Sequence, residues 1–217
     1  MTVQVMLISP ALNAALREAR FDGDAPLDPA GARRARAAAP GVPAADRYVR
    51  GPSVRCAATA DALGLRTDPD LALRDWDMGR WSGQRLAEVG ASEPDAVSAW
   101  LADPSAAPHG GESLLELCAR VGGWLNSVAV SDAPRDSAAA SGAAKESVKV
   151  LAGDGGGRVL GVVEPAVVRA VTVRALDLPT QAFWRLDVAP LTLTALSGRS
   201  GRWNLRCGQP LSPAPGN

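Results

Sequence analysis

The sequence predicts an α/β fold, a three-layer α/β/α sandwich around a largely parallel sheet. Residues 3–9 form an apolar run rich in Val, Leu and Ile, which is typical of a buried central strand. Strand and helix patterns alternate through the early part of the chain, and further strand patterns gather near its end. Alternation of this kind favours a parallel sheet covered by helices on both faces. The 217 residues, 47% of them hydrophobic, suit a single domain spanning 1–217.

The elements that follow the first strand are marked by capping and stop residues. Asp28 can cap a helix in "PLDPAGARRARAAA", and Ser53 can cap one in "PSVRCAATADALGL", which Gly64 ends. Between these helices, residues 46–51 are a strand candidate. Two short helices are then expected in "GQRLAEVG" and "EPDAVSAWLADP", the second ended by Pro104.

The clearest helix begins near residue 113, in "ESLLELCARVGGWLNSV". Ser113 and Glu116 have the spacing of a capping box, in which each side chain bonds to the backbone N–H of the other residue. An apolar stripe with helical period follows it, made of Leu114, Cys118, Val121, Leu125 and Val128.

Small and polar residues without an apolar period dominate residues 131–157. We expect most of this stretch to be a flexible surface insertion within the domain, with a short strand conceivable at 147–151. Core patterns resume after it. Residues 158–163 predict a strand and residues 165–178 a helix with Pro165 in its first turn. Three more strands are expected in "FWRLDV", "LTLTAL" and "RWNLRC".

Charge and composition exclude several classes of partner. The formal net charge is zero and the pI is near 6.6, so neither nucleic acid nor an anionic membrane is expected as a partner. No apolar run approaches the length of a membrane span, and the N-terminus lacks the basic start of a signal peptide. A cytoplasmic location is therefore expected. The low lysine content and the abundance of Ala, Gly, Pro and Arg are typical of a GC-rich bacterial genome.

The cysteines indicate neither a disulfide framework nor a metal site. They are three in number, far apart and without a CxxC pair, so we expect small buried apolar residues. No metal and no cofactor are expected. The identity of a protein partner stays open, and so does a homodimer. The three cysteines are Cys56, Cys118 and Cys207.

Two turns are placed where ligand chemistry usually sits in such a sheet, beyond the carboxyl ends of strands. They are Ser9-Pro10-Ala11 and Glu164-Pro165-Ala166. Together with "DAPLDPAG", "RGPSVRCAATA", "LRDWDMGRWSG" and the "GES" of residues 111–113, they give the chain a pattern that resembles the histidine phosphatase superfamily, the phosphoglycerate-mutase-like fold. The resemblance runs from about residue 3 to 206. It implies phosphomonoester hydrolase or mutase activity.

The departures from that pattern fall on the residues that would carry the chemistry. In the family, a strand leads into Arg-His-Gly, and the histidine attacks phosphorus while two arginines and a second histidine stabilise the transferring group. Here Ser9 stands at the Arg position, Pro10 at the nucleophilic His position and Glu164 at the second His position. Arg55 keeps the place of the second phosphate-binding Arg. Asp75 falls where many members carry an acidic proton donor.

Three further residues are expected around the same cleft. The chain's sole histidine, His109, is interpreted as a loop residue on the rim and not as a substitute nucleophile, because no neighbouring residue type suggests an orienting base. Glu112 and Ser113 of the "GES" segment are expected on the same rim. The six tryptophans are expected to serve in packing.

Three functions are compatible with these residues. The favoured one is a domain that has lost phosphohistidine chemistry and serves in binding or regulation, with Glu164 paired to Arg55 in the former anion pocket. The alternative is a hydrolase with a rewired site, acting on a small phosphorylated or anionic metabolite through Asp75, Glu164 and Arg55. A structural protein with an irrelevant cleft is the third.

Overall fold

The computed structural model describes residues 2–21, 24–131 and 157–211. Six strands form one sheet in the order β3-β2-β4-β1-β5-β6. Strands β1, β2, β3 and β4 run parallel to one another, whereas β5 pairs antiparallel with both β1 and β6. The strands are β1 (Val3–Ile8), β2 (Arg47–Arg50), β3 (Asp68–Pro69), β4 (Arg158–Val162), β5 (Thr192–Arg199) and β6 (Arg202–Pro210).

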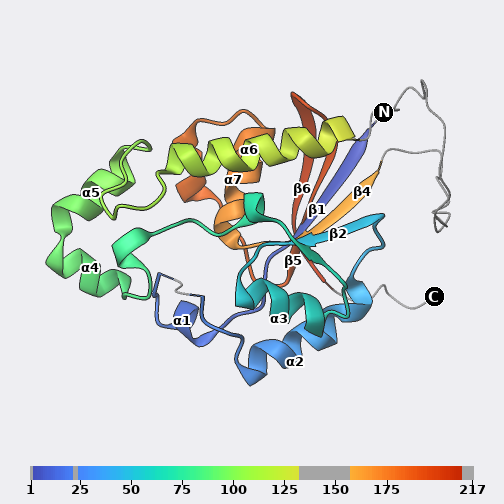
Figure 1. Ribbon diagram of the computed structural model, residues 1–217, viewed down its shortest axis with the longest axis horizontal. Coiled ribbons are helices and arrows are strands. Elements are labelled where there is room, and N and C mark those ends of the chain that lie inside the picture. The colour runs from blue at the N-terminus through green and yellow to red at the C-terminus, as the bar shows by residue number, and fades with distance from the viewer. Residues whose placement is uncertain (1, 22–23, 132–156, 212–217) are drawn as a thin grey trace, which may run out of the picture.

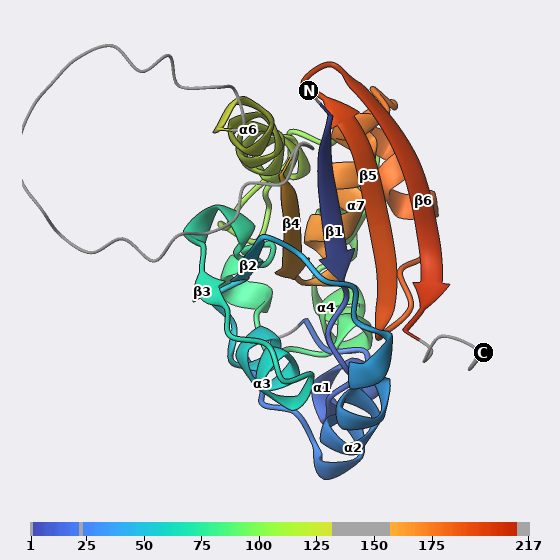
Figure 2. The same ribbon diagram turned by 90° about the vertical axis from the view of Figure 1, so that its right-hand side faces the viewer.

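Helices cover the sheet on both faces, with α6 and α7 on one side and α2 and α3 on the other, while α4 and α5 extend to one end (Figure 1). Figure 2 shows the twist of the sheet from β3 to β6. The helices are α1 (Ala14–Arg17), α2 (Pro29–Ala38), α3 (Val54–Ala62), α4 (Leu86–Ser92), α5 (Pro94–Ala102), α6 (Leu114–Ser131) and α7 (Pro165–Ala175). In the described part of the chain, four 3-10 turns lie between these helices and strands: η1 (Ala39–Gly41), η2 (Leu71–Leu73), η3 (Gly79–Trp81) and η4 (Thr180–Arg185). The predicted three-layer α/β fold is confirmed.

The first strand divides the core into two halves because its side chains alternate between the two faces of the sheet. Val3, Val5 and Leu7 lie in the cluster under α6 and α7, while Met6 and Ile8 lie in the smaller cluster under α2 and α3. All five are buried. The apolar run in the sequence therefore belongs to a strand that is covered on both faces.

The predicted helix starts are also confirmed. The Asp28 side chain accepts from the Gly31 N–H at 2.7 Å, and the Ser53 hydroxyl accepts from the Cys56 N–H at 3.1 Å. At the start of α6, the Ser113 N–H donates to the Glu116 carboxylate at 2.8 Å and the Ser113 hydroxyl accepts from the Glu116 N–H at 3.2 Å. This reciprocal pair is the predicted capping box.

Two predictions about the later part of the chain are wrong. The segment "FWRLDV" is not a strand, because Phe183 and Trp184 belong to the 3-10 turn η4 and pack against Trp76 in an aromatic cluster. Cys207 is exposed, whereas Cys56 and Cys118 are buried as expected, and none of the three forms a disulfide. The expected flexible insertion at 131–157 and the strand at 147–151 lie almost entirely outside the described residues.

Within the described ranges, no helix is long and apolar enough to cross a membrane.

Candidate functional site

Three parallel strands end together and bring the two predicted turns side by side. Ile8 of β1 is in register with Val162 of β4, and the Val163 N–H donates to the Ile8 carbonyl at 3.0 Å. On the other side of β4, the Gly51 N–H donates to the Val162 carbonyl at 2.9 Å. The segments that follow these three strands therefore meet at one edge of the sheet, as the carboxyl ends of parallel strands do.

The turn after β1 points its one polar side chain away from the neighbouring turns. Ser9 is fully buried, and its hydroxyl donates to the Ala189 carbonyl and accepts from the Thr192 N–H at 3.3 Å. Pro10 is buried as well and carries no N–H. The Ala11 N–H donates to the Thr59 hydroxyl of α3 at 3.2 Å. This turn is therefore tied into the scaffold by hydrogen bonds to β5 and α3.

The turn after β4 brings Glu164 against the start of α3. The side chains of Arg55 and Glu164 are 2% and 1% exposed, and the guanidinium binds the carboxylate through two nitrogens: Nη2 donates to Oε2, and Nε donates to Oε1 at 3.3 Å. The Ser53 hydroxyl donates to the same Oε1 at 2.8 Å. The carboxylate is thus neutralised and hydrogen-bonded, which is the condition under which a protein can bury a charge.

Cys56 completes this buried group, with its thiol 3.4 Å from the Glu164 Oε1 atom. Burial is the main cause that raises the pKa of the Cys56 thiol to about 12. Because the thiolate is the nucleophilic form, a thiol with that pKa is inert near neutral pH. Cys56 therefore acts here as a small packing residue and a weak hydrogen-bond donor.

A cleft of about 630 Å³ opens above this group. Its acidic lining residues are Asp24, Asp75 and Glu164, and no basic side chain lines it among the residues that the structure describes. Asp24 also accepts from the Val54 N–H at 2.7 Å, so its carboxylate adds to the cap of α3. The remaining lining residues are Pro52, Ser53, Trp76, Ser82 and Gly83.

In the described part of the chain, no group of three His, Cys, Asp or Glu side chains is close enough to hold a metal ion. The cleft therefore offers separate hydrogen-bond acceptors, suited to hydroxyl or ammonium groups of a ligand. Asp75 is half-buried beside the buried Trp76, whose ring forms part of the same wall.

His109 does not have the expected place on the rim. It is 1% exposed, its ring packs on Trp81 with centroids 5.1 Å apart, and it is not among the residues that line the cleft. Its Nδ1 atom accepts from the Gly111 N–H at 3.0 Å, so the neutral ring carries its proton on Nε2. Burial lowers the pKa of the imidazole. The packing of the imidazole on the Trp81 ring accounts for the buried position of His109.

Glu112 and Ser113 are also placed behind the cleft wall. Arg120 binds the Glu112 carboxylate with two nitrogens, each at 2.7 Å, and Arg74 adds a third contact at 3.2 Å. The Glu112 carbonyl accepts from the Trp76 indole N–H at 2.6 Å. Glu112 therefore positions Trp76, and Ser113 caps α6, while neither residue lines the cleft.

Sequence reasoning named Arg55, Asp75 and Glu164, and the structure brings Glu164 to Arg55 while placing Asp75 and Glu164 in one cleft. Sequence reasoning missed Asp24, and it missed the hydrogen bond from the Ser53 hydroxyl to Glu164. The signal for Ser53 was its place two residues before Arg55, in a turn that follows a parallel strand. Asp24 carried no such signal, because its neighbourhood is created by the fold.

Comparisons with known proteins agree with this architecture. A segment of 66 residues is 42% identical to glucosyl-3-phosphoglycerate phosphatase of Mycobacterium tuberculosis, and it covers 29% of this chain and 30% of that protein. The matched part is thus less than a third of the relative's length.

Solved structures resemble the chain over nearly all of its length. A mycobacterial glucosyl-3-phosphoglycerate phosphatase has a TM-score of 0.75 at 24% identity, covering 97% of this chain and all of that one. The alpha-ribazole phosphatase from Shigella flexneri has a TM-score of 0.77 at 17% identity, covering 99% and 100%. These likenesses show the fold. The family model of the histidine phosphatase superfamily (branch 1) matches residues 11–208, and this chain belongs to that superfamily.

Proposed function

We propose that the cleft binds a small ligand bearing hydroxyl or ammonium groups and does not carry out phosphohistidine transfer. The buried ion pair between Arg55 and Glu164 is the observation on which this rests. A phosphoryl group in transfer carries negative charge that needs nearby positive charge. Arg55 already has a carboxylate as its partner, so a phosphate would have to displace Glu164 or lie beside it.

The nucleophile is a second reason. The position that the family resemblance gives to the attacking histidine is occupied by Pro10, whose ring nitrogen is part of the amide and neither attacks nor accepts a proton. Neither nearby candidate supports a replacement. Cys56 has its pKa raised to about 12, and His109 lies buried against Trp81 outside the cleft lining.

The lining of the cleft supports the proposed class of ligand. Asp24 and Asp75 supply negatively charged hydrogen-bond acceptors, the Glu164 carboxylate being neutralised by Arg55, and Trp76 supplies an apolar wall. Such a surface complements hydroxyl and ammonium donors and repels phosphate dianions.

Matched hexoses provide the test. We expect glucosamine to raise the melting temperature, and expect no increase from glucose 6-phosphate, inorganic phosphate or vanadate. Asp24→Asn and Asp75→Asn should each weaken glucosamine binding, since each removes a carboxylate charge from the cleft. Asp61→Asn, on the exposed side of α3, is the matched control and should change nothing. A phosphate-dependent increase in wild type that disappears in Arg55→Ala would contradict the proposal.

A second candidate is a phosphoric ester hydrolase with a rewired site, and it is supported by the names of the relatives, which are phosphatases. In this candidate Asp75 activates water or protonates the leaving group, and Arg55 binds the phosphoryl oxygens after exchanging Glu164 for substrate. Turnover of p-nitrophenyl phosphate separates the two functions. A rate that survives repurification and is lost in both Asp75→Asn and Arg55→Ala, without an acid-labile phosphoenzyme, supports the hydrolase. Absence of such a rate supports the binding domain.

A further inference from the structure

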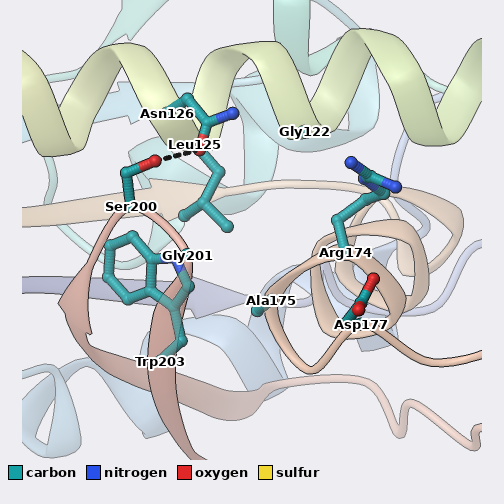
Figure 3. A pocket seen from close by; sticks show the side chains of 9 residues that line it. All are labelled: Gly122, Leu125, Asn126, Arg174, Ala175, Asp177, Ser200, Gly201 and Trp203. Carbon is teal, nitrogen blue, oxygen red and sulfur yellow. Dashed lines mark hydrogen bonds between the residues drawn. The ribbon is translucent and has the colours of Figure 1, made fainter.

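A second cavity of about 320 Å³ lies at the opposite end of the sheet from the cleft (Figure 3). Its walls come from the middle of α6, the end of α7 and the turn between β5 and β6. That turn is next to the beginning of β1, because Val3 is in register with Gly198. The cleft, by contrast, follows the end of β1. A cavity of this volume is at the small end of the range for small-molecule sites.

Two opposite charges lie on one side of this cavity without pairing. Arg174 is in the last turn of α7 and Asp177 follows the helix, and Figure 3 shows both side chains at the same wall. Neither forms an ion pair with the other or with any further residue among those described. Both are exposed and therefore open to a ligand.

The position of Asp177 is unfavourable for a carboxylate on structural grounds. Its backbone is in the left-handed region, with φ 50°, where glycine is the usual residue after a helix. The end of a helix also carries partial negative charge, which disfavours an acidic side chain there. Glycine would be the more stable residue at this place, and aspartate is among the residues that enter this region most often after it.

Gly122 makes room for Arg174. A β-carbon at position 122 would lie 3.0 Å from the Arg174 Nε atom and 3.3 Å from its Cγ atom. Glycine in the middle of a helix costs about 1 kcal/mol relative to alanine. The next residue, Gly123, is exposed and has nothing within 4 Å of its corresponding position, whereas Gly122 is buried beside Arg174.

The opposite wall is apolar at its base and polar at its top. Leu125 and Trp203 are buried side chains that line it, and Figure 3 shows them across the cavity from Arg174. Above them, the Ser200 hydroxyl donates to the Asn126 side-chain oxygen at 3.0 Å. A ligand here meets a cation and an anion on one side, and on the other the small exposed parts of Leu125 and Trp203 below a polar rim.

We propose that this cavity binds a free L-amino acid with an apolar side chain. The α-carboxylate is bound by Arg174, the α-ammonium by Asp177, and the side chain lies against Leu125 and Trp203. Charge-assisted hydrogen bonds of this kind are the stronger class, and the two charges of a zwitterion match the two unpaired groups of the wall. The site is independent of the function proposed for the cleft.

Calorimetric titration with L-phenylalanine and its blocked derivatives tests the assignment of each charge. We expect millimolar or tighter binding of L-phenylalanine. L-Phenylalaninamide, which lacks the carboxylate, and N-acetyl-L-phenylalanine, which lacks the ammonium, should each bind at least about tenfold more weakly. No binding of L-phenylalanine, or equal binding of all three compounds, would overturn the proposal.

Variants locate the binding in this cavity. Asp177→Gly removes the carboxylate while relieving the backbone, so it should keep or raise the melting temperature and lose at least about tenfold in affinity. Arg174→Gln should lose affinity to a similar extent. Gly122→Ala should weaken binding by displacing Arg174, while the matched control Gly123→Ala should leave it unchanged. Unchanged affinity in Asp177→Gly and Arg174→Gln would place the amino acid elsewhere and overturn the proposal.

Discussion

At each end of helix α7 a carboxylate lies near an arginine, which comes from α3 at the start and from α7 itself at the end, and the two arrangements are opposite. At the start, Glu164 is buried against Arg55 and bound through two nitrogens of the guanidinium. At the end, Arg174 and Asp177 are exposed and unpaired among the described residues. The same pair of charges is therefore part of the scaffold at one end and available to a ligand at the other.

The difference between the buried and the exposed charges matters because burial removes their hydration. A buried charge loses its hydration and must keep its partner, so the Arg55–Glu164 pair resists exchange with a ligand. An exposed charge keeps its hydration, and a ligand replaces water at little cost. Charge type alone is thus a poor guide to a binding site, and exposure together with pairing is the better one.

Removing one partner of the buried pair is expected to give the largest effect. Glu164→Ala leaves the Arg55 guanidinium buried without its carboxylate, and we expect the free energy of unfolding to fall by about 3–5 kcal/mol. Chemical denaturation of wild type and variant measures it. At the exposed end of α7, Asp177→Asn, which keeps a residue that tolerates positive φ, should change the same quantity by less than about 0.5 kcal/mol.

A double substitution tests whether pairing is the cause. Arg55→Met with Glu164→Leu removes both charges while roughly keeping volume, and should be much closer to wild type than Glu164→Ala. If the single and double variants are equally unstable, the loss comes from packing, and the contrast between the two ends of α7 is not one of charge.

Local signals in the sequence predicted much of the scaffold. Asp28, Ser53 and Ser113 were each identified as helix starts, and each caps its helix with the expected hydrogen bond. Capping depends on residues within one turn, so a short segment contains the necessary information. The ion pair of Glu164 with Arg55 was also predicted, because the family resemblance places both residues in one anion pocket.

Tertiary contacts account for the errors. "FWRLDV" has strong strand propensity, yet Phe183 and Trp184 form a 3-10 turn because their rings pack on Trp76 and Trp100. His109 was expected on the cleft rim and is instead buried against Trp81. In both places an aromatic cluster, assembled from segments far apart in the sequence, determines the outcome. The cavity at the far end of α7, for which we propose an amino-acid ligand, likewise has no sequence motif.

His109 is another buried titratable residue, and its imidazole becomes charged when it takes up a proton. Burial lowers the pKa of its imidazole, with Asp77 opposing and Arg80 adding to that effect. The unfolded chain takes up a proton near pH 6.5 and the folded protein only at lower pH, so stability due to this residue is present above pH 6.5 and is lost as pH falls toward the folded pKa. The loss is about 1.4 kcal/mol for each pKa unit.

The measurement is the free energy of unfolding of wild type and His109→Asn between pH 7 and pH 5. Asparagine keeps an acceptor for the Gly111 N–H but does not titrate in this range. We expect the wild type to lose more stability than the variant on acidification, while the titration of the carboxylates cancels between them. Parallel curves would mean that His109 is protonated in the fold without cost.

The smallest expected effect is the difference in stability between alanine substitutions at Gly122 and Gly123 of α6. It tests the contact with Arg174 at the exposed end of α7. Gly123→Ala adds a methyl group to an exposed, open position of the helix, and should stabilise the protein by about 0.5–1 kcal/mol. Gly122→Ala gains the same helix propensity but pushes the new methyl group against Arg174, so its net gain should be smaller or negative. The difference between the two melting temperatures reports the cost of the buried position beside Arg174. Equal stabilisation by both alanines would show that Arg174 moves freely, and that the wall of the amino-acid cavity is less preorganised than its unpaired charges suggest.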